Sequence, residues 1–142
     1  MRTSPRPRSQ SPRSLRERGA AAVELAIVFP LLFLVIAGIV DFGRAFFTQI
    51  QVTNAAREGA RAAVVMVPNA SVITRATNAA AGVPQVAATV VASCTTGATS
   101  DASVKVTAPF QWILLGPAMS MLGKSFGGGN EISSTGVMRC NG

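Results

Sequence analysis

The stretch GAAAVELAIVFPLLFLVIAGIV at residues 19–40 decides the fold of this chain. From Ala20 to Val40 it runs for 21 residues, and Glu24 carries its only charged side chain. A transmembrane helix needs about 20 predominantly apolar residues, so this stretch is long enough to cross a bilayer once. Pro30 removes one backbone hydrogen bond and is expected to kink the helix, which membrane helices tolerate.

A cleavable secretory signal peptide is the main alternative to a membrane anchor. Its apolar region would be shorter, and Ala37-Gly38-Ile39 is a poor match to the small residues that signal peptidase requires. An uncleaved signal anchor stays open as an alternative.

Most of the positive charge lies before the apolar stretch. Residues 1–19 contain six arginines and one acidic residue, whereas the rest of the chain has seven basic and five acidic residues. The net charge of +7 therefore comes mostly from the N-terminal tail and not from a folded binding surface. We expect no nucleic acid to be bound directly. A basic tail before an apolar segment marks the cytoplasmic side of a membrane. Residues 1–18, rich in Ser, Pro and Arg, are expected to lack regular structure.

The helix is expected to continue beyond the membrane, because residues 41–67 contain no proline. If residues 20–66 are helical throughout, they extend about 70 Å at 1.5 Å per residue, which predicts a long stalk. Ala55, Gly59 and Ala63 recur at every fourth position of this extension. Their small side chains would let another surface approach the helix backbone closely.

Charged residues on the same extension predict a helix interface. Asp41 and Arg44 stand three positions apart and can pair on one face. Arg57 and Arg61 also share a face, and Glu58 or a neighbouring subunit could supply the carboxylate that they need. A merely solvated helix face is an equally open interpretation.

Beyond Pro68 the sequence predicts a small α+β domain. A short helix over residues 70–81 is followed by three segments of alternating apolar residues, at 86–94, 102–108 and 131–140. The expected fold class is thus α+β, with a long membrane-spanning helix, a short helix and a three-stranded antiparallel sheet. The expected domains are a basic leader at 1–19, a transmembrane part at 20–41, its extracytoplasmic continuation at 42–67 and the small domain at 68–142.

The chain has two cysteines, Cys94 and Cys140, so only one pairing within it is possible. Strands one and three would run in the same direction, which puts both cysteines at one end of the sheet. An exported domain would permit a disulfide there, and two free thiols are the alternative.

The segment Phe110-Gln111-Trp112-Ile113-Leu114-Leu115 is strongly apolar, and Leu115, Met119 and Leu122 then recur at helical spacing. We expect a short helix that packs against the stalk. A patch that faces a partner is the alternative, because a three-stranded sheet has little core to absorb this surface.

Residues for catalysis are scarce. The chain has no histidine, its acidic residues are scattered, and two distant cysteines do not make a zinc site. We therefore expect no enzyme, no catalytic residues, no cofactor, no metal and no small-molecule substrate.

Three segments together resemble the TadE/TadG-like pseudopilins of bacterial tight-adherence (Flp-type) pilus systems. They are residues 18–32 (RGAAAVELAIVFPLL), 41–44 (DFGR) and 54–61 (NAAREGAR), and the resemblance covers about residues 16–66. It implies a prepilin that a membrane prepilin peptidase cuts between Gly19 and Ala20, which leaves Glu24 as the fifth residue. Major pilins of similar families have Tyr after this Glu, whereas Leu25 follows here, as suits a pseudopilin.

The resemblance further implies a structural subunit that helps to assemble or anchor a pilus for adhesion to surfaces. Its partners would be the membrane, the prepilin peptidase and other pilin or pseudopilin subunits. It would cross the bacterial cytoplasmic membrane once, with its N-terminus in the cytoplasm, and could be incorporated in a surface pilus. The alternative is an unprocessed, single-pass envelope protein whose extracytoplasmic domain binds another membrane protein.

Overall fold

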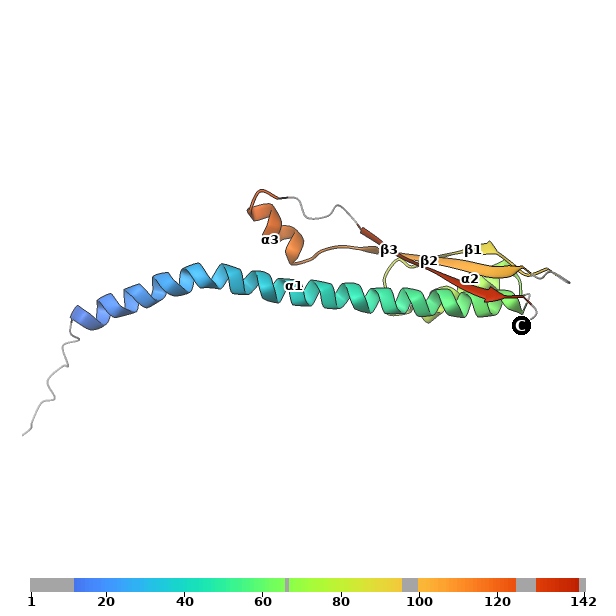
Figure 1. Ribbon diagram of the computed structural model, residues 1–142, viewed down its shortest axis with the longest axis horizontal. Helices are drawn as coiled ribbons and strands as arrows, with labels where there is room; N and C mark the ends of the chain where they lie inside the picture. Colours follow the sequence, from blue (N-terminus) through green and yellow to red (C-terminus); the bar gives the residue numbers. More distant parts are fainter. Residues whose placement is uncertain (1–11, 66, 96–99, 125–129, 141–142) are drawn as a thin grey trace, which may run out of the picture. The chain divides into compact units, whose positions relative to one another are not determined.

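The computed structural model describes residues 12–65, 67–95, 100–124 and 130–140 of this chain. It contains the helices α1 (Pro12–Val64), α2 (Asn69–Ala79) and α3 (Leu115–Met121), and the strands β1 (Ala87–Ala92), β2 (Asp101–Phe110) and β3 (Asn130–Arg139) (Figure 1). The predicted α+β class is confirmed. Two compact units, residues 1–37 and 38–142, make up the chain, and α1 contributes to both.

In the first unit, α1 begins earlier than the sequence predicted. We expected residues 1–18 to lack regular structure, but the helix begins at Pro12. Proline suits the first position of a helix, and Leu15, Arg16 and Glu17 are good helix formers that continue the helix toward the N-terminus. Pro30 lies inside α1 and does not end it.

Most of the apolar residues described in this unit are on the surface of the chain. Every residue from 18 to 33 is exposed. Between Arg18 and Val64, α1 contains a window that is long and apolar enough to cross a membrane, by length and composition. It is compatible with single-pass membrane anchoring.

In the second unit, the three strands form one antiparallel sheet in the order β1-β2-β3. The alternation of β2 is complete, because Ala102, Val104, Val106, Ala108 and Phe110 are buried and the residues between them are not. β1 has an irregular register between Val90 and Ala92. The predicted antiparallel sheet and the shared direction of β1 and β3 are confirmed.

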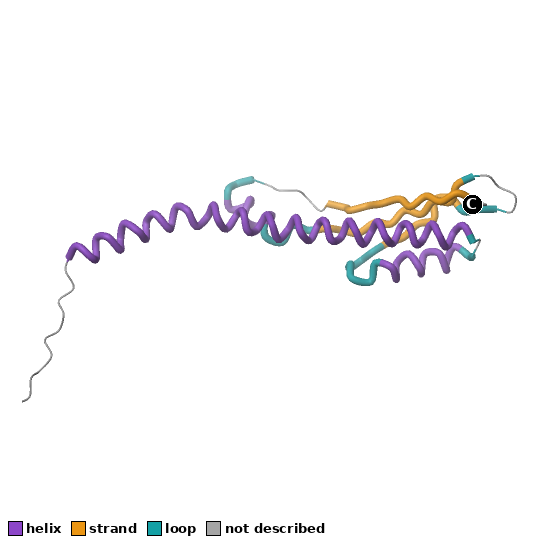
Figure 2. The backbone as a smooth tube through the Cα atoms, turned by 60° about the horizontal axis from the view of Figure 1, so that its bottom comes forward, coloured by secondary structure: helices purple, strands orange, loops and turns teal. Residues whose placement is uncertain are grey.

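The core of this unit lies where α2 and the sheet pack against the part of α1 beyond residue 51 (Figure 2). Alanines dominate the buried face of α1. Among the described residues, the largest fully buried side chains are those of four valines and one aspartate. Small side chains let the elements lie close together but bury little apolar area each. Such a core contributes modestly to stability.

Candidate assembly site and membrane boundary

Gly19, Ala20 and Glu24 lie on the exposed surface of α1 in the first unit. Apart from the neighbouring residues and backbone of the helix itself, no atom lies within 4 Å of the position that a Cβ on Gly19 would occupy. The bond between Gly19 and Ala20 joins two exposed residues. The bond is helical, and a protease that binds extended backbone would have to unwind it. Glycine lowers the cost of that unwinding, since it disfavours a helix by about 1 kcal/mol relative to alanine.

Glu24 borders a shallow hollow formed with Ala21, Leu25 and Val28. Among the described residues, no basic side chain lies within ion-pair distance of its carboxylate. An exposed carboxylate between apolar side chains is costly in a bilayer. The described part of the chain thus places apolar side chains, and no positive charge, beside this carboxylate.

Asp41 directly follows the apolar stretch and is fully buried in the second unit. Its Oδ2 accepts hydrogen bonds from the backbone N–H groups of Leu114, at 2.9 Å, and Leu115, at 2.8 Å. These N–H groups lie at the N-terminus of α3, which lacks a capping side chain of its own. Asp41 thus caps a helix that is more than 70 residues away in the sequence.

Arg44 also connects α1 to the segment that follows β2. One of its guanidinium nitrogens, Nη1, lies 3.3 Å from Asp41 Oδ1 and donates a hydrogen bond to the carbonyl oxygen of Gln111. The guanidinium also lies 5.4 Å from the ring centre of Phe110. The expected pair between Asp41 and Arg44 is present, and both residues also fasten the end of β2 to α1.

Trp112 packs between two phenylalanines. Its ring makes edge-to-face contacts with Phe42 of α1 and Phe110 of β2, at centroid distances of 5.3 and 5.1 Å. Such contacts are worth about 0.5–1.5 kcal/mol each beyond their buried area. The sequence predicted that this segment packs on the stalk, and Trp112 and Leu115 do so. It missed Asp41 as the attachment point, although the absence of a capping residue before α3 was a usable signal.

The stripe of small residues on α1 faces the chain itself. Ala55, Gly59 and Ala63 are all buried. A Cβ added to Gly59 would lie 2.9 Å from Val104 Cγ1 and 3.0 Å from Ala76 Cβ. The surface that approaches Gly59 is therefore that of β2 and α2. The close approach that the sequence predicted at Gly59 is thus made by other elements of the same chain.

Arg57 and Arg61 are exposed on the opposite face of α1, and Glu58 is half-buried. Within the described ranges, no carboxylate lies within ion-pair distance of either arginine, so Glu58 does not supply one. At 100° per residue, Phe46 and Ile50 fall on the same face as these arginines, and both are exposed. This outer face of α1, composed of Phe46, Ile50, Arg57 and Arg61, is apolar at one end and basic at the other.

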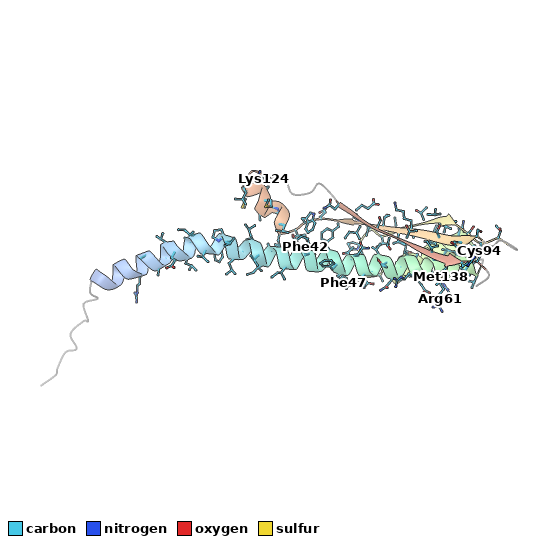
Figure 3. All side chains as sticks on the ribbon, viewed as in Figure 1. Phe42, Phe47, Arg61, Cys94, Lys124 and Met138 are labelled. Atoms are coloured by element: carbon cyan, nitrogen blue, oxygen red, sulfur yellow. A yellow bond between two sulfur atoms is a disulfide. The ribbon has the colours of Figure 1, made fainter. Side chains whose placement is uncertain are left out.

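The predicted disulfide between Cys94 and Cys140 is present, with its Cα atoms 5.7 Å apart. Cys94, Met138 and Arg61 lie at the same end of the domain (Figure 3). The backbone N–H of Cys140 also donates a hydrogen bond to the carbonyl oxygen of Ser100. The bridge joins the segment after β1 to the residue after β3, across the central strand β2.

Comparison with known proteins gives one family. Residues 19–61 match the family model described as TadE-like protein. The matched segment begins at Gly19 and includes Glu24, the Asp41–Arg44 pair and both exposed arginines. It confirms the resemblance seen in the sequence. No curated protein and no solved structure matches the chain.

Proposed function

We propose, from the TadE-like match over residues 19–61, that this chain is a pilin-like structural subunit of a tight-adherence pilus system. A prepilin peptidase would remove residues 1–19, and α1 would then pack beside the corresponding helices of other pilin or pseudopilin subunits. The chain would help to assemble or anchor a pilus that adheres to surfaces. The match supports a protein related to this pilus, and the arrangement of charges on α1 supports the more specific role.

The main support for the proposal is the exposed Glu24, which lies in an otherwise uncharged stretch and has no ion-pair partner among the described residues. An acidic residue at the centre of a transmembrane helix costs about 2.5–3.5 kcal/mol, and less near the interface. Cleavage after Gly19 would create an α-amino group at Ala20. The carboxylate of Glu24 could then pair with the amino group of a neighbouring subunit, which offsets the cost and sets the register between the two helices.

The outer face of α1 supports contacts beyond the membrane. Exposed Phe46 and Ile50 offer apolar surface to a neighbouring helix, and Arg57 and Arg61 have no acidic partner among the described residues of their own chain. A neighbour with carboxylates opposite these arginines would complete the pairs. The small side chains of α1 are already covered by its own sheet, so the outer face is the one left for assembly.

N-terminal sequencing of the mature protein tests this proposal, in cells that contain the cognate prepilin peptidase. We expect the mature chain to begin at Ala20. Gly19→Leu should leave a full-length precursor, whereas Gly43→Leu, at an equally open glycine of α1, should be cut normally. A mature chain that still begins at Met1 would overturn the subunit proposal and favour the unprocessed envelope anchor.

A further inference from the structure

The chain runs back along α1 toward the apolar stretch as it leaves the sheet. Phe110 lies over Arg44, Trp112 packs on Phe42, and the N–H of Leu115 bonds to Asp41. Each later residue thus meets an earlier residue of α1. Asp41 is the first residue after the uncharged run that ends at Val40. The segment therefore reaches α3 at the point where α1 would leave the membrane.

α3 is fixed at both ends. Asp41 caps its first N–H groups, and Gly123 ends it in the left-handed conformation, with φ of 69°. The N–H of Gly123 donates to the carbonyl oxygen of Ser120, and that of Lys124 to Met119. A seven-residue helix is too short to be stable by itself in water, so these caps hold it in place.

The large side chains that α3 and its flanks expose are apolar, although Ser120 of α3 is exposed as well. Met121 is 89% exposed, Leu122 62% and Ile113 57%. No charged residue occurs between Lys105 and Lys124. Lys124 lies three residues after the end of α3, and Phe42 lies near the other end of the helix (Figure 3). A short apolar helix beside a tryptophan, with a lysine at its end, has the composition of an element that lies at a membrane surface.

We propose that the segment Trp112–Lys124 is a second membrane contact, in which α3 lies in the outer leaflet of the bilayer that α1 spans. Met121 and Leu122 contact the acyl chains, and Lys124 reaches the headgroups. Asp41 determines the depth of α3 in the bilayer, because it joins α3 to the end of the apolar stretch of α1. The inference rests on the proposed membrane insertion of α1. Two contacts would restrict the tilt and rotation of the subunit in the membrane before it is assembled.

Fluorescent probes attached to single cysteines test this contact. Cys94 and Cys140 are both in the disulfide, so a single added cysteine would be the free thiol that the probe labels. We would place the probe at Met121 or Leu122 in the full chain, in vesicles of phosphatidylcholine and phosphatidylglycerol. Val91 on β1 is the matched control, because it is 63% exposed, like Leu122. Val91 also lies far from Asp41. Its neighbour Val90 pairs with Val104 of β2, and Val104 contacts Gly59, which is about 27 Å from Asp41 along α1.

The quenchers are lipids with a nitroxide at a shallow or a deep acyl position. An interfacial helix buries its apolar face about 5–10 Å into the boundary, so we expect the shallow nitroxide to quench the probes at Met121 and Leu122 by roughly half or more. The probe at Val91 should not respond. Asp41→Ala, which frees α3, should reduce the quenching at Leu122.

A probe at Leu31, in the middle of the apolar stretch, separates the two proposals. If the deep nitroxide quenches Leu31 but Met121 and Leu122 behave like Val91, the contact of α3 is overturned while the insertion of α1 stands. If Leu31 is not quenched, the insertion of α1 fails, and the contact of α3 fails with it. If Met121 and Leu122 become shielded only at high protein density, without any response to nitroxides, a second copy covers α3 and the lipid contact is overturned.

Discussion

Gly136 of β3 lies directly against the backbone of Ala56 in α1. A Cβ added to Gly136 would overlap the carbonyl oxygen of Ala56 and would lie 2.8 Å from the backbone nitrogen of Arg57. The obstacle is backbone, so no rotation of a side chain can relieve it. At this position the backbone of β3, an outer strand of the sheet, packs directly on the backbone of α1.

Gly136→Ala should therefore destabilise the domain. Overpacking typically costs about 1–3 kcal/mol, and we expect a loss of at least this size in the free energy of unfolding. Thermal unfolding of the full chain in detergent, followed by circular dichroism, measures it. Gly43→Ala is the control, since no atom outside its own stretch of helix lies within 4 Å of its Cβ position. Alanine also favours the helix by about 1 kcal/mol relative to glycine. Equal stability of the two variants would contradict the close contact.

The main elements of this fold follow from local patterns, which explains why the sequence predicts them. A helix needs only continuous propensity, and the alternation in β2 follows from the pleat of a strand. α1 ends at Val64 and α2 begins at Asn69, and each of these positions is within two residues of the predicted one. The start of α1 at Pro12 was missed because composition favoured disorder, whereas a helix extends cooperatively from a strong segment.

The contacts between distant segments were harder to predict. The sequence pairs Asp41 with Arg44 because they are three positions apart, but its bonds to Leu114 and Leu115 depend on where β2 ends. Gly59 was correctly identified as a point of close approach, yet the sequence does not say which surface approaches. Glycine inside a strand, as at Gly136, often marks such a contact and was a usable signal.

Asp41→Ala should loosen α3, because it leaves the buried N–H group of Leu115 and the half-buried N–H group of Leu114 without this acceptor. Each such group costs about 1–3 kcal/mol, so the backbone amides of Leu114 and Leu115 should exchange hydrogen much faster. Asp41→Asn keeps one acceptor oxygen and should give an intermediate rate. Hydrogen exchange with mass spectrometry measures these rates, and Asp101→Asn, at an exposed position, serves as the control. Unchanged exchange in Asp41→Ala would contradict the capping role.

The disulfide should supply a large part of the stability of the small domain. Cys94 and Cys140 are 46 positions apart, and closing a loop of this length in the unfolded chain stabilises the fold by about 3–4 kcal/mol. Replacing both cysteines by serine should reduce the free energy of unfolding in urea by this amount. A reductant should lower the stability of the native chain and leave the double variant unchanged. Equal stability with and without the bridge would refute this expectation.

Glu24→Ala should separate membrane insertion from assembly. The variant removes the only charge between Ala20 and Val40, so it should insert in the membrane and be cut after Gly19 at least as well as the native chain. It loses the carboxylate that would pair with the α-amino group of a neighbour, so its co-purification with other pilin-like subunits after crosslinking should fall several-fold. Ile27→Ala, at an exposed apolar residue of the same stretch, should assemble normally. If Glu24→Ala assembles as well as Ile27→Ala, the carboxylate does not set the register between subunits.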